Sequence, residues 1–175
     1  MASRKTSTGR SLPRQSSRGF TLIEIVVVMG LLAVVGGVTL IVSMDSFRGY
    51  TFRSEVSTLT AVLQKARSQA VNNMCFGAGC TNGKPHGIHI EGNTYTIFQG
   101  ASYAARDQAQ DEMITPQSKA VTLSGITDVV FTELSGAAAT LPSGAPAIIL
   151  SDNAGKTSSV SINAEGRICA DAASC

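Results

Sequence analysis

The chain of 175 residues has no tryptophan, only two histidines and 5% aromatic residues in all. Its charged residues make up 15%, against about 25% in a typical soluble domain. Disordered chains are charge-rich and poor in apolar residues, so a hydrophobic content of 43% excludes that class. No Ser/His/Asp signature, phosphate-binding loop or paired-carboxylate motif is present, and two histidines are too few for most catalytic schemes. The sequence therefore predicts an ordered protein that is not an enzyme and has no cofactor.

Positive charge is scarce outside the N-terminus. The formal net charge is +2, yet the first 19 residues hold five basic side chains and no acidic one: Arg4, Lys5, Arg10, Arg14 and Arg18. The rest of the chain has nine basic and twelve acidic residues, a charge of −3. Only Arg167 is basic after Lys156, which argues against a phosphate-binding tail and against nucleic acid as a partner.

A long apolar run follows the basic end. The 23 residues Phe20–Val42 carry one charge, that of Glu24. At ~1.5 Å rise per residue, a helix of this run is about 35 Å long, enough to cross a hydrocarbon core of about 30 Å. A secretory signal peptide has an apolar core of only about 7–15 residues and a small-residue cleavage site, which does not follow here. The run predicts a membrane anchor, and the basic residues before it place the N-terminus in the cytoplasm and the rest outside.

Glu24 needs an explanation within this anchor. A carboxylate costs about 2.5–3.5 kcal/mol near the centre of a bilayer and less near its interface. One interpretation is an interfacial glutamate without a special role. The other is a carboxylate that awaits a cationic partner. A cut before Phe20 would create such a partner, a new α-amino group four residues away, within the same subunit or in a neighbour.

The residues Arg18–Glu24 read RGFTLIE and lead into the apolar run. This segment resembles the prepilin processing motif of type IV pilins and type II secretion pseudopilins, with glycine before the cut and glutamate fifth in the mature chain. The resemblance implies that a membrane aspartic peptidase cleaves the Gly19–Phe20 bond and methylates the Phe20 amine. It also implies that Glu24 neutralises the Phe20 amine of a neighbouring subunit as a filament grows.

By the same resemblance, the chain is a single-pass protein of the bacterial inner membrane that later enters a pilus or pseudopilus. The implied partners are the prepilin peptidase/methyltransferase, other pilin or pseudopilin subunits and the inner-membrane assembly platform. The expected domains are a basic leader at 1–19, the transmembrane half of a long helix at 20–46, its amphipathic half at 47–73 and an exported head at 74–175.

Apolar residues recur at helical spacing after the membrane run. They are three or four positions apart, the period of one apolar stripe: Phe52, Val56, Leu59, Leu63, Ala66 and Ala70. No proline occurs between Pro13 and Pro85. The pattern predicts one helix from about Phe20 to Asn73, ended by Asn72-Asn73 and a glycine-rich segment.

From residue 86 the apolar period changes to two. Six strands are predicted, at 86–91, 94–99, 119–123, 126–133, 147–151 and 157–162, with glycine-containing turns between them. Gly92-Asn93 reads as a tight hairpin turn, and the polar segment 101–117 reads as a loop or short helix. A long helix followed by a small antiparallel sheet is an α+β, pilin-like fold.

The head also resembles one branch of the family, the GspH/FimT-type minor pseudopilins and minor pilins. The matching segments are GIHI with YTIF, then VVFTELSG, AIILSD and SVSINAEGRI. We therefore expect a minor subunit that acts in assembly initiation or protein secretion. A major type IV pilin that forms the filament body is the alternative within this class. An exported metal- or ligand-binding module is the alternative outside it.

Four cysteines lie in the exported part, at Cys75, Cys80, Cys169 and Cys175. In an oxidising compartment they predict disulfides, with three possible pairings. The local loops Cys75–Cys80 and Cys169–Cys175 are favoured, and the alternative links the helix end to the C-terminal strand. A zinc site of Cys75, Cys80, His86 and His89 is a further alternative, but its spacing is not that of a common zinc finger. No metal site is predicted.

Acidic residues offer a weaker candidate site. Asp107, Asp111 and Glu112 cluster in the 101–117 segment and are interpreted as a solvated loop face. Asp128 and Asp152 could join a calcium site, but no EF-hand-like spacing supports one.

Overall fold

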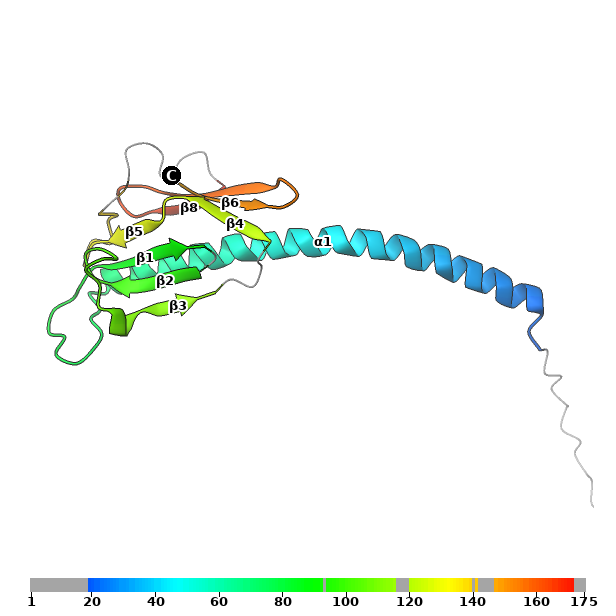
Figure 1. The fold of residues 1–175 in the computed structure, drawn as a ribbon, viewed down its shortest axis with the longest axis horizontal. Helices are drawn as coiled ribbons and strands as arrows, with labels where there is room; N and C mark the ends of the chain where they lie inside the picture. The colour runs from blue at the N-terminus through cyan, green and yellow to red at the C-terminus, as the bar shows by residue number, and fades with distance from the viewer. Residues whose placement is uncertain (1–18, 93, 116–119, 140, 142–146, 172–175) are drawn as a thin grey trace, which may run out of the picture. The chain divides into compact units, whose positions relative to one another are not determined.

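The structure is a computed structural model that describes residues 19–92, 94–115, 120–139, 141 and 147–171, with only the backbone described at 39–45. By its internal contacts the chain divides into two units, 1–44 and 45–175. Within these described residues one long helix is followed by eight short strands, so the predicted α+β fold is confirmed (Figure 1). The leader, Asn93 of the predicted hairpin turn and Cys175 lie outside the described residues.

The helix α1 spans Leu22–Val71, close to the predicted 20–73. Its end is a Schellman motif, in which the N–H of Met74 donates to the oxygen of Gln69 and the N–H of Asn73 donates to that of Ala70, both at 3.0 Å. Asn73 takes the left-handed conformation that this motif requires, with φ 53°. Asparagine tolerates that conformation better than most residues, which explains why the helix stops here.

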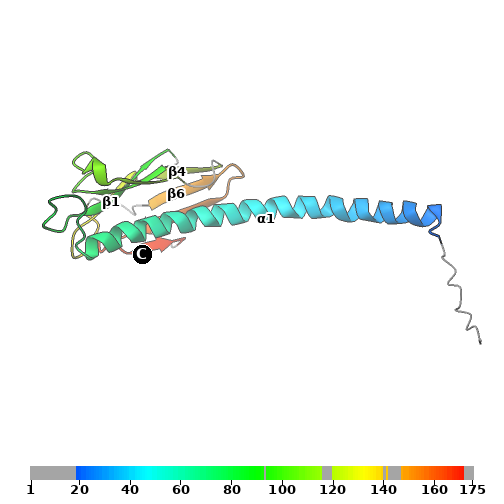
Figure 2. The ribbon, with the colours of Figure 1, turned by 90° about the horizontal axis from the view of Figure 1, so that it is seen from below.

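The strands form two four-stranded sheets, whereas the sequence predicted a single small sheet. The first has the order β3-β2-β1-β5 and the second β4-β6-β7-β8, with all neighbours antiparallel. Their bounds are β1 His86–Glu91, β2 Thr94–Gln99, β3 Glu112–Ile114, β4 Val121–Gly125, β5 Asp128–Phe131, β6 Ala147–Asp152, β7 Thr157–Ile162 and β8 Ile168–Ala170. Both sheets lie along the part of α1 that belongs to the second unit (Figure 2).

Two strands and part of one segment differ from the prediction. β3 and β8 have three residues each, too few to show the alternation that marks a strand in sequence. The segment 101–117 contains a 3-10 helix at Gln108–Gln110 and then β3, which pairs with β2. The segment is therefore built onto the first sheet and is not only a loop or helix.

The predicted apolar stripe of α1 forms the centre of the core. Five of its six residues are at most 3% exposed and the sixth, Val56, is partly buried. They pack in one cluster with Ile88 and Tyr95 of the first sheet and Ile148 and Leu150 of the second. The two sheets thus share one core through the same helix.

Glu55 is buried as well, at 3% exposed, although it does not belong to the predicted stripe. It faces the interior beside Tyr95, whose phenol is itself 1% exposed. Burial raises the pKa of Tyr95 far above its ordinary value, and the Glu55 carboxylate raises that pKa further. The interior of the head therefore contains a polar pair that the apolar pattern did not indicate.

Candidate functional site

The predicted cleavage site lies directly before α1. Gly19 and Phe20 are exposed and belong to no helix or strand, and the Phe20 side chain is 77% exposed. A methyl group placed on Gly19 would meet no atom of the described residues within 4 Å. The described part of the fold therefore does not demand glycine at position 19.

Thr21 and Glu24 together begin the helix. The N–H of Glu24 donates to the carbonyl oxygen of Thr21 at 3.1 Å and to its hydroxyl oxygen at 3.4 Å. Thr21 is thus the N-cap, and glutamate three residues later is the spacing of a capping box. A carboxylate in the first turn also interacts favourably with the positive end of the helix dipole. The charge of Glu24 therefore favours the start of α1, although its carboxylate does not close the capping box.

The Glu24 carboxylate makes no hydrogen bond or ion pair with any residue that the structure describes. It is exposed on the first turn of α1. A charge at this position is free to meet a cation from outside the chain. The α-amino group of Phe20 would exist only after cleavage.

The first part of α1 is apolar on every side. All large apolar side chains between residues 22 and 38 are exposed, from 48% for Val28 to 82% for Leu22. A helix that is hydrophobic all round is normally covered by protein or by a membrane. The predicted run Phe20–Val42 continues into residues 39–42, whose side chains lie outside the described part.

Within the described residues, no helix combines the length and the mean hydropathy that a membrane-spanning helix requires.

The cysteines are used in disulfides. Cys75 and Cys80 are bonded to each other, with their Cα atoms 5.7 Å apart. Cys169 is also disulfide-bonded, and its favoured partner Cys175 lies outside the described residues. The Cys75–Cys80 bond closes the glycine-rich loop that follows α1.

The alternative zinc site is not assembled. Its two sulfur atoms are joined in the disulfide, and its two histidines are three residues apart on β1 and so point to opposite faces of the sheet. His86 is 1% exposed, and its Nδ1 lies 2.9 Å from the oxygen of Lys84. Burial lowers the pKa of His86, and the hydrogen bond to Lys84 opposes this shift in part. Among the residues described, no group of three potential ligands is placed to hold a metal ion.

The acidic residues of the 101–117 segment do not form one cluster. The carboxylate of Asp107 caps the 3-10 helix by accepting from the N–H of Ala109 at 3.3 Å. Asp111 accepts from Nε of Arg106 at 2.8 Å, and Glu112 accepts from Nζ of Lys65 on α1 at 2.6 and 2.7 Å. The Asp111 side chain is only 13% exposed, so the interpretation as a solvated loop face was wrong for this residue.

The two aspartates considered for a calcium site make separate contacts and do not share a partner. Asp128 lies 2.8 Å from Nδ1 of His89, and Asp152 accepts from the N–H groups of Ala154 and Lys156 in the β6–β7 turn. Each carboxylate therefore stabilises its own strand end.

A stack of side chains that the sequence did not indicate holds the 101–117 segment. Tyr103 lies parallel to His89 at 3.7 Å between ring centroids, and the guanidinium of Arg106 lies 3.6 Å from the same Tyr103 centroid. At these distances the two groups would overlap if they lay on the same face of the Tyr103 ring. His89 and Arg106 therefore lie on opposite faces of that ring. A sequence shows neither partner, because these contacts depend on where the segment folds back.

Comparison with known proteins finds one match. Residues 14–41 match the family model described as the prokaryotic N-terminal methylation motif. No curated protein and no solved structure matches the chain. The matched segment includes Gly19, Phe20 and Glu24, the residues that the sequence singled out. The comparison therefore shows a prokaryotic N-terminal methylation motif at this end of the chain.

Proposed function

We propose that this protein is a structural subunit of a type IV pilus or a type II secretion pseudopilus. The observation that carries the proposal is the methylation motif over residues 14–41. Prepilin peptidase cleaves the Gly19–Phe20 bond, and the same enzyme methylates the new Phe20 amine. The exposed, irregular backbone at this bond supports the proposal, because a peptidase needs an extended and accessible substrate.

The precursor is anchored in the bacterial inner membrane by the apolar half of α1, with the basic leader in the cytoplasm. Two observations support the anchor. The run Phe20–Val42 has a single charge, and the large apolar side chains at 22–38 are all exposed on the chain by itself. Exposed apolar surface of this extent is costly in water and is stabilised in a bilayer or among other helices.

Assembly pairs Glu24 of one subunit with the methylated amine of Phe20 in another. An unpaired carboxylate is expensive in apolar surroundings, and an opposite charge offsets that cost. The exposed Glu24 carboxylate, which has no partner in the described part of the chain, supports this step. The partners are other pilin or pseudopilin subunits and the assembly platform of the membrane.

Within this class we propose a minor subunit that helps to initiate assembly or to secrete proteins. The support is the likeness of the head to the GspH/FimT-type subunits. The four matching segments fall on β1 with β2, on β5 with its following turn, on β6 and on β7 with its following turn. They thus supply strands to both sheets of the head.

Quantitative mass spectrometry of sheared filaments and of membranes from the native cells tests the proposal. We expect a peptide that begins at methylated Phe20, abundant in membranes and scarce in filaments. A peptide that dominates the filaments would make the chain a major pilin. An intact leader in cells that contain an active peptidase would overturn the filament proposal altogether.

A further inference from the structure

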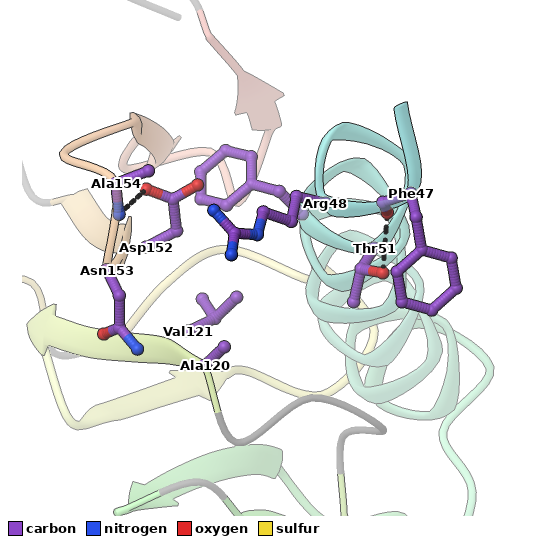
Figure 3. A pocket seen from close by; sticks show the side chains of 9 residues that line it. Phe47, Arg48, Thr51, Ala120, Val121, Asp152, Asn153 and Ala154 are labelled. Carbon is purple, nitrogen blue, oxygen red and sulfur yellow. Dashed lines mark hydrogen bonds between the residues drawn. The ribbon is translucent and has the colours of Figure 1, made fainter. Parts of the chain in front are cut away.

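A cavity of about 410 Å³ lies between α1 and the ends of the second sheet (Figure 3). Its helix wall includes Phe47, Arg48 and Phe52, and its sheet wall includes Val121 and Asp152. All five belong to the second structural unit, residues 45–175, so the cavity is formed within that unit. Neither the motif nor the proposed filament role makes use of it.

The cavity places one positive and one negative side chain opposite each other. The guanidinium of Arg48 extends from α1 toward Asp152 (Figure 3). Arg48 nevertheless makes no ion pair or hydrogen bond with the residues that the structure describes. Oδ1 of Asp152 accepts from the N–H groups of Ala154 and Lys156 at 2.9 and 2.8 Å, which leaves Oδ2 open. A cation and an anion therefore face one space without neutralising each other.

The rest of the cavity wall is largely apolar. Phe52 and Val121 are 3% and 5% exposed and form buried surfaces, whereas Phe47 is 70% exposed. The Nζ of Lys156 lies 5.1 Å from the centroid of the Phe52 ring, so a second cation is close to the sheet side. A ligand that fits this cavity carries a negative and a positive group beside an apolar part.

The place of Arg48 in the chain indicates where such a ligand is found. It follows the end of the apolar run at Val42 by six residues in the sequence. Phe47 and Tyr50 are 70% and 74% exposed, and exposed aromatic residues beside a membrane run are typical of the headgroup level.

We propose that this cavity binds the headgroup of a phospholipid that carries a primary ammonium group, the phosphatidylethanolamine class. Arg48 binds the phosphate through charge-assisted hydrogen bonds, and Oδ2 of Asp152 accepts from the ammonium. The glycerol and first acyl carbons lie against Phe47. The inference rests on the proposed membrane anchor, and it adds a contact that ties the head to the bilayer before assembly.

Other headgroups fit less well. A headgroup with only a phosphate can pair with Arg48 but brings no N–H group to Oδ2 of Asp152. The quaternary ammonium of choline has no N–H to donate to Oδ2. The preference for a primary ammonium is therefore the property that an experiment must test.

The test uses the full chain in detergent micelles and a titration with dihexanoyl-phosphatidylethanolamine, followed by the NMR signals of the backbone N–H groups of Val121 and Ala154, which line the cavity. We expect saturable shifts, with about tenfold weaker binding for Arg48→Gln and for Asp152→Asn. The asparagine retains Oδ1 and with it the β6–β7 turn. Arg53→Gln is the matched control, because Arg53 is exposed on the same helix and does not line the cavity.

Titrations with other lipids test whether the cavity prefers the ethanolamine headgroup. Binding of dihexanoyl-phosphatidylcholine or -phosphatidylglycerol as tight as that of the ethanolamine lipid would overturn the proposal. Equal binding of free phosphoethanolamine would point to a soluble phosphate ester and would overturn the lipid source. Binding unchanged in both cavity variants would overturn the site. Cleavage of the same variants by prepilin peptidase is measured in parallel, because only a failure of cleavage counts against the proposed function.

Discussion

The imidazole of His89 lies parallel to the phenol ring of Tyr103, with 3.7 Å between their centroids and 11° between their planes. Phe98 meets the same tyrosine edge-on at 5.6 Å. Through these contacts the 101–117 segment covers the face of the first sheet that is turned away from the core. Tyr103 thus connects a polar insertion to strands β1 and β2.

Replacement of Tyr103 tests this connection. We expect Tyr103→Ala to lower the free energy of unfolding by about 2 kcal/mol, because it removes two aromatic contacts and the cation–π contact of Arg106. Urea unfolding of the mature chain in detergent, followed by near-UV circular dichroism, measures the change. Tyr50→Ala is the control, since Tyr50 is 74% exposed and should change stability by less than about 0.5 kcal/mol. Equal effects of the two substitutions would contradict the role of the stack.

Substitutions at Glu24 test whether its charge is needed for assembly. Glutamine at this position has nearly the size of glutamate and can form hydrogen bonds but has no charge. We expect Glu24→Ala and Glu24→Gln to be cleaved normally and to enter filaments poorly, because the proposed partner is the Phe20 amine. Filament incorporation is measured by immunoblot of sheared and membrane fractions. If Glu24→Gln assembles like the unaltered chain, the charge of Glu24 takes no part in assembly.

The buried His86 predicts a dependence of stability on pH. Its pKa is lowered from the ordinary 6.5 in the folded state, so the unfolded state binds more protons below that value. The free energy of unfolding should be constant above pH 6.5 and fall as the pH drops below it, by at most about 1.4 kcal/mol for each pH unit until the folded pKa is reached. Denaturant unfolding at several pH values measures this slope.

His86→Gln should reduce the slope below pH 6.5, because glutamine cannot be protonated there. His89→Gln is the companion variant, since His89 lies outside the core and beside the Asp128 carboxylate. A slope that persists in His86→Gln would assign the pH dependence to other groups.

The loop that contains Gly136 and the loop that contains Gly166 cross closely near the end of α1. There Nε of Arg67 donates to the carbonyl oxygen of Gly136 at 3.2 Å. A Cβ on Gly166 would overlap that same oxygen, and Gly166 has φ +74°. We therefore expect Gly166→Ala to cost about 3 kcal/mol or more. Gly155→Ala is the matched control, because φ there is +81° but no atom lies within 4 Å of the added carbon. Gly155→Ala should lower the free energy of unfolding by only about 1–2 kcal/mol, because only the unfavourable backbone conformation contributes. Thermal unfolding compares the two, and similar losses would contradict the close crossing.

Features that depend on neighbouring residues could be predicted from the sequence. The methylation motif is a short contiguous segment, so it can be read without a fold. The bounds of α1 followed from an apolar period of three to four residues and from Asn73, and β1 and β2 followed from alternation. In each case the signal lies within one element and is repeated several times.

Contacts between residues that are distant in the chain could not be predicted without the fold. The strands divide into two sheets because β4 pairs with β6 and β5 pairs with β1, and alternation says nothing about the partner of a strand. Tyr103 meets His89 only because its segment folds back, and Arg48 faces Asp152 across 104 positions of sequence only because the β6–β7 turn reaches α1. Such contacts form when the shared core brings the elements together, and no local pattern contains that information.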